Sequence, residues 1–350
     1  MGKSLTLKYR PKTFEEIIGQ NITTTILKKV VDARTFKNCI LLAGHSGCGK
    51  TTLARAFANA VNQGIGEPIE IDAASNNGVD NVRAIVESAK QRSLIGEYKI
   101  YIIDECHSIT TQGWQAFLKG IEEPAPYTIF IFCTTEPNKI PATILNRVQR
   151  YNINPISKED IYKRLVYICQ QENFTNYESG CDLISKIAQG GMRDAITMLE
   201  QCADYSTDIN VDNVKKVLGD FSYETMLKLT NIILDKKQAE MLQLLENLVN
   251  QGQDLKQFIN SYLDFILDLT KYLLFKDINT TNIPAYLETV ADNNINVKYT
   301  TGMGTGNENE SLKYFNMMAE KLLNIKLNIK QDPSFKTTIE VGLIQLCRGE

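Results

Sequence analysis

Apolar runs alternate with amphipathic stretches along the first 150 residues of the chain. Four short apolar runs bounded by turn residues predict buried strands. Between them, apolar positions recur every three or four residues, which predicts helices that cover a sheet. The strands are expected at residues 39–43, 68–72, 98–103 and 127–133, and the helices at 51–61, 79–93 and 113–123. This alternation favours a parallel sheet covered on both faces.

The pattern changes at Ser157, after which every periodic segment is helical. Ser157 followed by Glu159 and Asp160 is typical of a helix start. Helices are expected at 158–172, 180–188, 193–203, 211–218, 239–250 and 255–275. Breaks near residues 154–156 and 219–221 then predict three domains. We expect an α/β domain over 1–156, a small helical domain over 157–220 and an all-helical domain over 221–350.

Length, charge and cysteines narrow the possible functions. A chain of 350 residues exceeds the size at which a single core stops growing. The net charge of −3 argues against a uniformly basic nucleic-acid coat but leaves room for a local basic track. The eight cysteines are too widely spaced for a C-x-x-C metal knuckle and indicate reduced thiols of a cytoplasmic protein. No apolar run approaches the roughly 20 residues of a membrane helix.

A glycine-rich loop lies between the first expected strand and the helix that follows it. The loop matches G-x-x-x-x-G-K-[ST], in which two glycines let successive backbone N–H groups point at phosphates, Lys50 reaches the terminal phosphates and Thr51 reaches magnesium. The alternative is a glycine turn before an ordinary helix. We expect nucleotide contacts from Gly44, Ser46, Gly47, Cys48, Gly49, Lys50, Thr51 and Thr52.

An acidic pair, Asp104 and Glu105, follows the apolar strand at 98–103. At a strand end near a phosphate loop, Asp104 would hold magnesium and Glu105 would activate the attacking water. Without a phosphate loop nearby, such a pair would fit the solvated start of a loop as well as it fits a magnesium site. With His107 the stretch also spells the D-E-x-H box of helicases, but such motors need two P-loop-like lobes and the sequence predicts one. His107 either couples the nucleotide to a partner or packs beside the strand.

Five further stretches resemble the clamp-loader ATPases of the bacterial DNA polymerase III gamma/tau family. They are Leu-Lys-Tyr-Arg-Pro at 7–11, Ile-Asp-Ala-Ala-Ser-Asn-Asn-Gly-Val at 71–79, Phe-Leu-Lys-Gly-Ile-Glu-Glu-Pro at 117–124, Thr-Thr-Glu-Pro-Asn-Lys-Ile-Pro at 134–141 and Gly-Met-Arg-Asp-Ala at 191–195. The resemblance is strong over residues 5–205 and rests on helical content and length beyond 220. It implies an α/β P-loop (AAA+) domain with a parallel sheet, a helical lid domain and an all-α collar domain.

The resemblance also implies roles for polar residues around the nucleotide. Thr135 matches sensor 1, a polar group near the γ-phosphate, and Arg193 matches sensor 2, which reaches the phosphates from the lid. Because an arginine at a helix start opposes the helix dipole, Arg193 needs an anionic partner, for which we favour phosphate over Asp194. The residues expected near the adenine are Tyr9, Arg10, Pro11 and Ile18.

Arg147 matches the family's arginine finger, which completes the site of a neighbouring subunit in trans. Its neighbours Asn146 and Val148 depart from the family's Ser-Arg-Cys triplet, and Arg150 is the competing candidate. The resemblance therefore implies an oligomer, with the five subunits of a pentamer as the expected assembly.

The expected DNA contacts rest on thinner grounds. A helix opening after Asn77 and Gly78 would present backbone N–H groups to a phosphate. Lys119 matches a basic position that faces DNA in the family, and Arg83 would lie on the same track. Both cations are equally compatible with a solvated surface.

Two features of the family are missing from this sequence, and the first of them bears on metal binding. The family's four-cysteine zinc module, usually placed after the P-loop helix, has no counterpart between Asn62 and Glu70, so we expect no zinc. The family's C-terminal tail is also missing from the 350 residues, and a phage-encoded form fits this reduced version.

The sequence thus predicts an ATPase subunit of a sliding-clamp loader that uses ATP and Mg²⁺. The expected partners are other loader subunits, the sliding clamp and primer–template DNA, with no membrane, in the cytoplasm of a bacterium or of a phage-infected host. The alternatives are a replication-associated scaffold whose assembly is switched by ATP with little turnover, and a D-E-x-H helicase.

Overall fold

The computed structural model describes residues 4–218, 223–250, 252–275, 308–329, 332 and 334–349. The chain divides into two compact units, Met1–Val214 and Lys215–Glu350. The break expected at 219–221 lies outside the described residues, and the division into three domains stays a prediction.

The first unit contains a five-stranded parallel sheet with the order β2-β3-β4-β1-β5. All four expected strands form. A fifth strand was not predicted, because only its alternate residues Tyr151 and Ile153 are buried and the others are polar, as befits an edge strand. The strands are β1 Cys39–Gly44, β2 Ile69–Asp72, β3 Lys99–Asp104, β4 Thr128–Thr134 and β5 Gln149–Ile153.

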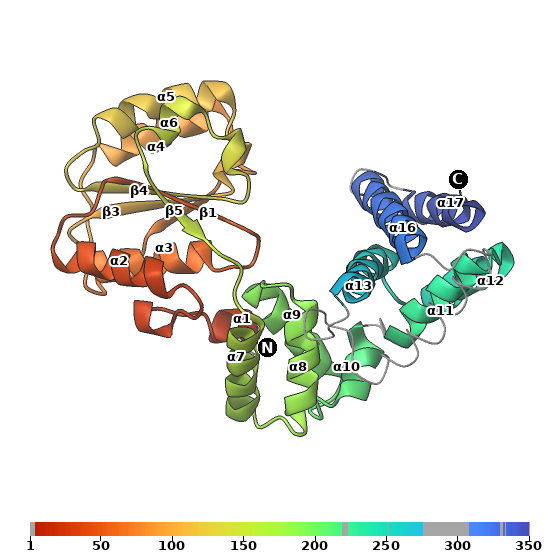
Figure 1. Cartoon of the computed structure of the whole chain (residues 1–350). Helices are drawn as coiled ribbons and strands as arrows, with labels where there is room; N and C mark the ends of the chain where they lie inside the picture. The colour runs from red at the N-terminus through yellow and green to blue at the C-terminus, as the bar shows by residue number, and fades with distance from the viewer. Residues whose placement is uncertain are drawn as a thin grey trace. The chain divides into compact units, whose positions relative to one another are not determined.

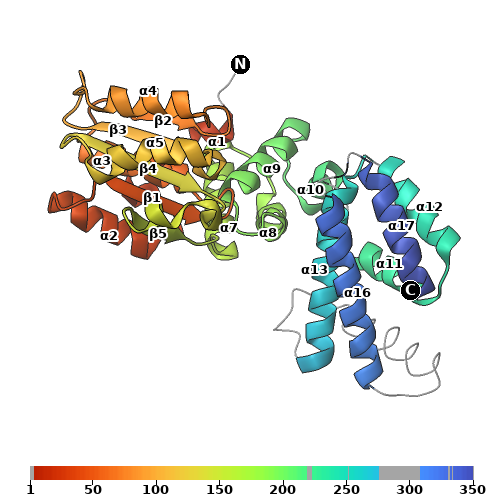
Figure 2. The same ribbon diagram turned by 90° about the horizontal axis from the view of Figure 1, so that it is seen from above.

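Helices cover both faces of this sheet, as Figures 1 and 2 show. One face packs against α2 Asn21–Asp32 and α3 Lys50–Val61, and the other against α4 Val79–Ala89, α5 Thr111–Glu122 and α6 Ala142–Leu145. Strand β1 is buried on both sides, because Ile40 and Leu42 enter one core cluster while Cys39 and Leu41 enter the other. This explains its continuous apolar run.

The remaining helices of the first unit follow the sheet. Ser157 caps the first of them by accepting a hydrogen bond from the Asp160 N–H at 3.1 Å. The helices are α7 Lys158–Glu172, α8 Tyr177–Ile187, α9 Met192–Tyr205 and α10 Val211–Leu218, the last of which runs into the second unit. A short N-terminal helix, α1 Leu5–Lys8, packs against α9.

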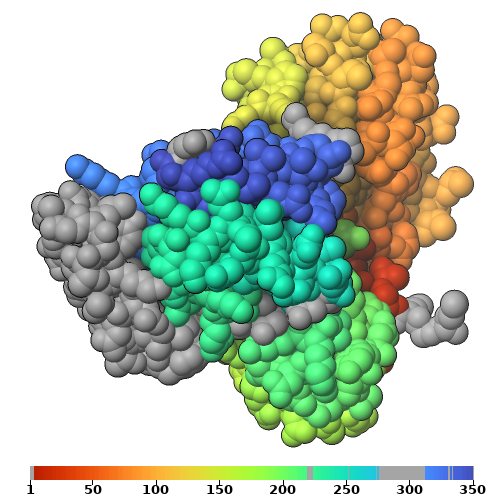
Figure 3. Space-filling view, turned by 90° about the vertical axis from the view of Figure 1, so that its right-hand side faces the viewer, coloured from red at the N-terminus to blue at the C-terminus, as the bar shows by residue number. Residues whose placement is uncertain are grey.

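The second unit is helical throughout its described residues and has its own core. Its helices are α11 Tyr223–Leu234, α12 Gln238–Asn250, α13 Leu255–Phe275, α16 Glu308–Ile329 and α17 Phe335–Arg348. Helices α13 and α16 run side by side (Figure 2). In the space-filling view of Figure 3, the teal residues of this unit contact the blue residues of its last helices. Among the described helices, none is long and apolar enough to cross a membrane.

Candidate nucleotide site

The glycine-rich loop joins β1 to α3 and has the geometry of a phosphate cradle. Gly47 and Gly49 have φ angles of +72° and +98°, which favour glycine. Gly44 is required for a different reason, since a Cβ atom there would lie 2.2 Å from the Ile153 carbonyl oxygen of β5. The loop therefore depends on glycines for its curvature and for its fit against the sheet edge.

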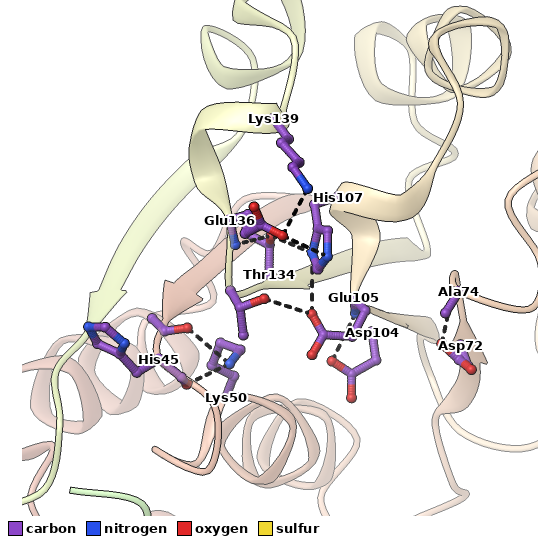
Figure 4. Close-up of polar contacts among 12 residues, drawn as sticks. His45, Lys50, Asp72, Ala74, Asp104, Glu105, His107, Thr134, Glu136 and Lys139 are labelled. Atoms are coloured by element: carbon purple, nitrogen blue, oxygen red, sulfur yellow. Dashed lines mark hydrogen bonds and ion pairs between the residues drawn. The ribbon is translucent and has the colours of Figure 1, made fainter. Parts of the chain in front are cut away.

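Lys50 begins α3 and its side chain folds back over the loop. Only 6% of the residue is exposed, and Nζ donates to the carbonyl oxygens of Gly44 at 3.0 Å and His45 at 2.8 Å. Figure 4 shows both contacts. A buried ammonium group held at the mouth of a phosphate cradle is placed to pair with phosphate oxygens.

The end of β3 brings the acidic pair to the same site. Thr51 Oγ1 donates to Asp104 Oδ2 at 2.8 Å, and Asp104 Oδ1 accepts from the Glu105 N–H at 3.0 Å. A hydroxyl and a carboxylate that meet in this way supply the hard oxygen ligands that Mg²⁺ prefers. The donor set fits magnesium.

Glu105 follows β3 in a left-handed conformation with φ of 47°, which is uncommon for a residue other than glycine. Its Oε2 atom accepts from Thr135 Oγ1 at 3.2 Å and lies 3.3 Å from His107 Nδ1. The contact with His107 is drawn in Figure 4. The turn thus aims the carboxylate into the site, where Thr135 meets it from the end of β4.

The loop, the acidic pair and the N-terminal segment line one cavity of about 380 Å³, within the usual size of ligand pockets. Burial lowers the pKa of the Arg10 guanidinium, and the neighbouring Arg55 adds to this effect. The expected residues that line the cavity are Tyr9, Arg10, Pro11, Ile18, Ser46, Gly47, Cys48, Gly49, Lys50, Thr51, Thr52, Asp104, Glu105 and Arg193.

Tyr9 is tied to the helices after the sheet. Its hydroxyl donates to Glu172 of α7, which also accepts from Lys8 Nζ at 2.7 Å. Arg164, from the same helix, donates to the Tyr9 carbonyl oxygen at 2.6 Å and lines the cavity. Sequence reasoning missed Arg164 and Glu172, because neither belongs to a motif and only tertiary packing brings them to the site.

A third missed residue is Gln20, whose buried side chain joins two parts of the site. Its Nε2 donates to the carbonyl oxygen of Asn154 at 2.7 Å and to that of Cys48 in the loop at 3.4 Å. Nothing in the sequence indicates which groups Gln20 contacts.

Helix α9 meets the phosphate loop directly. The backbone N–H groups of Met192 and Arg193 donate to the Gly47 carbonyl oxygen at 3.0 and 3.4 Å. The described part of the chain contains no ion pair for Arg193, and Asp194 instead lies near Gly47 and Gly191. Arg193 therefore lies in the first turn of α9 and lines the cavity, where a bound anion would pair with its guanidinium.

Arg147 lies outside this cavity. Its guanidinium forms an ion pair with Glu122 at 2.8 Å and donates to the Thr143 carbonyl oxygen at 2.7 Å, with 40% of the side chain exposed. Arg150 donates to Asn152 at 2.9 Å along the edge strand β5.

The residues expected to contact DNA lie on or directly before two neighbouring helices that cover one face of the sheet. Gly78 caps α4, and the Asn77 carbonyl oxygen accepts from the Thr110 N–H before α5 at 3.3 Å. Arg83 on α4 is exposed and pairs with Asp80 at 3.4 Å, and Lys119 is exposed in the last turn of α5.

All eight cysteines are buried, and burial raises the pKa of the Cys39 thiol to about 12. Within the described ranges, no group of three or more histidine, cysteine, aspartate or glutamate residues could hold a metal ion on its own. The magnesium position inferred above has fewer protein ligands, and a bound phosphate would share it.

Three family models match consecutive parts of the chain. The model of the DNA polymerase III delta subunit matches residues 67–157, that of the DNA polymerase III clamp loader subunit ATPase lid domain matches 160–208, and that of domain III of subunits gamma and tau matches 209–348.

Curated relatives agree with these models. The DNA polymerase III subunit tau of Bacillus subtilis is 35% identical over 75% of this chain, which spans about half of that relative, 51%. The DNA polymerase III subunit gamma of Buchnera aphidicola subsp. Schizaphis graminum is 31% identical, and the match covers 75% of this chain and 78% of the relative.

The fold is shared with a solved AAA+ protein. The RuvB Holliday junction branch migration motor of Thermotoga maritima matches with a TM-score of 0.52 and 20% identity, over 64% of this chain and 79% of that one. This likeness concerns the fold alone and agrees with the expected P-loop fold followed by helical domains. From the matched models and relatives, the chain belongs to the DNA polymerase III gamma/tau family of clamp-loader subunits, which are AAA+ ATPases.

Proposed function

We propose that this chain is an ATPase subunit of a sliding-clamp loader. ATP binding assembles the loader, which opens the clamp and grips primer–template DNA, and hydrolysis releases both. The supporting observation is that the phosphate loop, the Thr51–Asp104 pair and the Glu105–Thr135 pair line or border one cavity, while α9 is bonded to the loop.

The nucleotide is held by the loop and its flanks. Backbone N–H groups between Gly44 and Thr52 surround the phosphates, and Lys50 exchanges its two carbonyl contacts for phosphate oxygens. Thr51 and Asp104 hold the magnesium ion, which when bound neutralises charge on the phosphate oxygens. Tyr9, Arg10, Pro11 and Ile18 surround the adenine end.

Glu105 acts as the general base that takes a proton from the attacking water. Thr135 holds its carboxylate and senses the γ-phosphate from the end of β4. Arg193 reaches the phosphates from the lid, because the start of α9 faces the loop.

Arg147 completes the site of a neighbouring subunit in trans. Its position outside the chain's own cavity and its partial exposure support this role, and assembly then requires it to leave Glu122. We further propose that the loader is a pentamer in the cytoplasm, and that Asn77, Gly78, Arg83 and Lys119 contact the DNA backbone.

The two alternatives are less well supported. A scaffold with little turnover has no need of Glu105, Thr135 and Arg147 together. A D-E-x-H helicase needs a second lobe, and the described residues form one sheet.

The test is ATP hydrolysis by the full chain, first alone and then with the sliding clamp and primed DNA of the same replication system. We expect low hydrolysis alone and a rise when both are added. Glu105→Gln should still bind ATP but hydrolyse it about 100-fold more slowly or worse, since a general base contributes roughly 10² to 10⁴. Hydrolysis that stays low when the clamp and DNA are added would favour the scaffold, and strand separation by the chain alone would favour the helicase.

A further inference from the structure

His107 lies between two glutamates, one inside the nucleotide site and one at the surface (Figure 4). Its Nδ1 atom is 3.3 Å from Glu105 Oε2 and 3.2 Å from Thr134 Oγ1. Its Nε2 atom is 3.5 Å from Glu136 Oε1. Only 16% of the His107 side chain is exposed. The imidazole therefore contacts carboxylates with both of its nitrogens.

The backbone fixes the imidazole in this position. The left-handed turn at Glu105 starts a short 3₁₀ helix, Cys106–Ser108, in which the Ser108 N–H donates to the Glu105 carbonyl oxygen at 2.9 Å. Thr134, fully buried at the end of β4, contacts the imidazole and also accepts from the Glu136 N–H at 3.0 Å. Glu105 and Thr134, which both contact His107, are thus held in place at the ends of β3 and β4.

The outer glutamate faces solvent. Glu136 pairs with Lys139 at 3.0 Å, and 49% and 58% of these side chains are exposed. Both lie in the segment that follows β4, where Glu136 precedes the 3₁₀ helix Pro137–Lys139 and Lys139 ends it. A contact on this segment that displaces Glu136 would consequently reach the imidazole, and through it the Glu105 carboxylate.

We propose that His107 is a positioning residue for hydrolysis. Through Nδ1 it holds the Glu105 carboxylate in the orientation that accepts a proton from water, and through Nε2 it makes that orientation depend on Glu136. This role rests on the proposed function of Glu105 as the base. A small displacement of a reacting group is costly, because a misplacement of about 1 Å lowers a rate about 100-fold.

Two substitutions test the roles of the two imidazole nitrogens of His107 separately. The amide of His107→Asn falls near the Nδ1 position and keeps the contact with Glu105, whereas that of His107→Gln falls near the Nε2 position and keeps the contact with Glu136. The measurement is the kcat of ATP hydrolysis by the full chain with clamp and primed DNA, together with the Kd for ATP in the absence of turnover.

We expect kcat to fall about tenfold or more in His107→Gln and about threefold in His107→Asn, with the Kd for ATP within about twofold of wild type in both. Glu136→Ala should lower kcat about as much as His107→Asn and add nothing to it, since both remove the contact between the Nε2 position and residue 136. A purely structural role would instead impair both His107 variants equally and weaken ATP binding.

Several other outcomes would contradict the positioning role of His107. Wild-type kcat in both His107 variants, a lower kcat in His107→Asn than in His107→Gln, or additive effects of Glu136→Ala and His107→Asn would each overturn the proposal. Glu105→Gln is measured alongside: if it hydrolyses ATP normally, the base assignment itself is wrong. If it is inactive while the His107 variants match wild type, only the positioning role is wrong.

Discussion

At the residue scale, two requirements meet at Gly44, which closes β1 and opens the phosphate loop. The residue must be small because β5 passes close to it, and it must leave the loop free to curve. The sequence motif predicts the second requirement, since the glycine is part of the phosphate cradle. It does not predict the first, because β5 is an edge strand whose polar positions hide it from a search for apolar runs.

Gly44→Ala should therefore destabilise the first unit and weaken ATP binding. The added Cβ would lie 2.2 Å from the Ile153 carbonyl oxygen, so β5 has to move, at a cost of about 1–3 kcal/mol. Gly78→Ala is the matched control, because nothing lies within 4 Å of a Cβ atom there and the cost should stay below about 1 kcal/mol. Urea unfolding and ATP binding check both variants, and equal stability of the two would contradict the steric argument.

At the element scale, the N-terminal segment is bonded to the lid helices. Tyr9 and Lys8 contact Glu172 on α7, the Leu5 N–H donates to Glu200 on α9 at 2.9 Å, and the next residues line the nucleotide cavity. Helix α9 in turn donates to the phosphate loop. The N-terminal segment therefore connects the cavity to two helices, α7 and α9.

The Tyr9 hydroxyl gives this connection a pH dependence. Burial raises the pKa of Tyr9 to about 12, and its hydrogen bond to Glu172 adds to the shift. Because the folded-state pKa lies above the unfolded value near 10, the stabilisation is complete below pH 10 and is lost as the pH rises through 12. Wild type should exceed Tyr9→Phe in stability by about 1 kcal/mol at pH 8.

Urea unfolding of both proteins at pH values from 8 to 12 checks this prediction. The difference in unfolding free energy should shrink above pH 10, and taking the difference removes the contribution of the other tyrosines. A difference that stays constant up to pH 12 would contradict the raised pKa of Tyr9, and a difference near zero at pH 8 would show that the hydroxyl does not contribute to stability.

Elements with a strong period were predicted closely, and weaker ones were not. Helix α7 has the expected bounds, because Ser157 caps it and its apolar positions keep the helical period. Helix α4 ends at Ala89 rather than at residue 93, since polar residues follow its last buried position. The α2 helix was not anticipated, because Leu27 and Val31 are its only buried residues.

At the scale of the whole molecule, motifs predicted residues that line the cavity but not the residues that hold them in place. Lys50 was predicted from the glycine-rich loop before its helix, and Asp104 and Glu105 were predicted from their place at the end of an apolar strand. Arg164, Glu172 and Gln20 were not, because their contacts join segments far apart in the sequence. The sequence of one chain does not specify how subunits are arranged. Substitution of Arg147, the residue proposed to act on a neighbouring subunit, tests whether two subunits share a site.

The most direct test of the account mixes two inactive subunits. Arg147→Ala and Lys50→Ala chains are combined in equal amounts with the other loader subunits, clamp and primed DNA, and ATP hydrolysis is measured, with Arg150→Ala as the control. An arginine finger contributes roughly 10³ to 10⁵ to hydrolysis, so each variant alone should be nearly inactive. The mixture should regain activity, because an intact Arg147 can complete an intact site across an interface, and Arg150→Ala should match wild type. No recovery in the mixture, or normal hydrolysis by Arg147→Ala alone, would contradict a site completed by a neighbouring subunit.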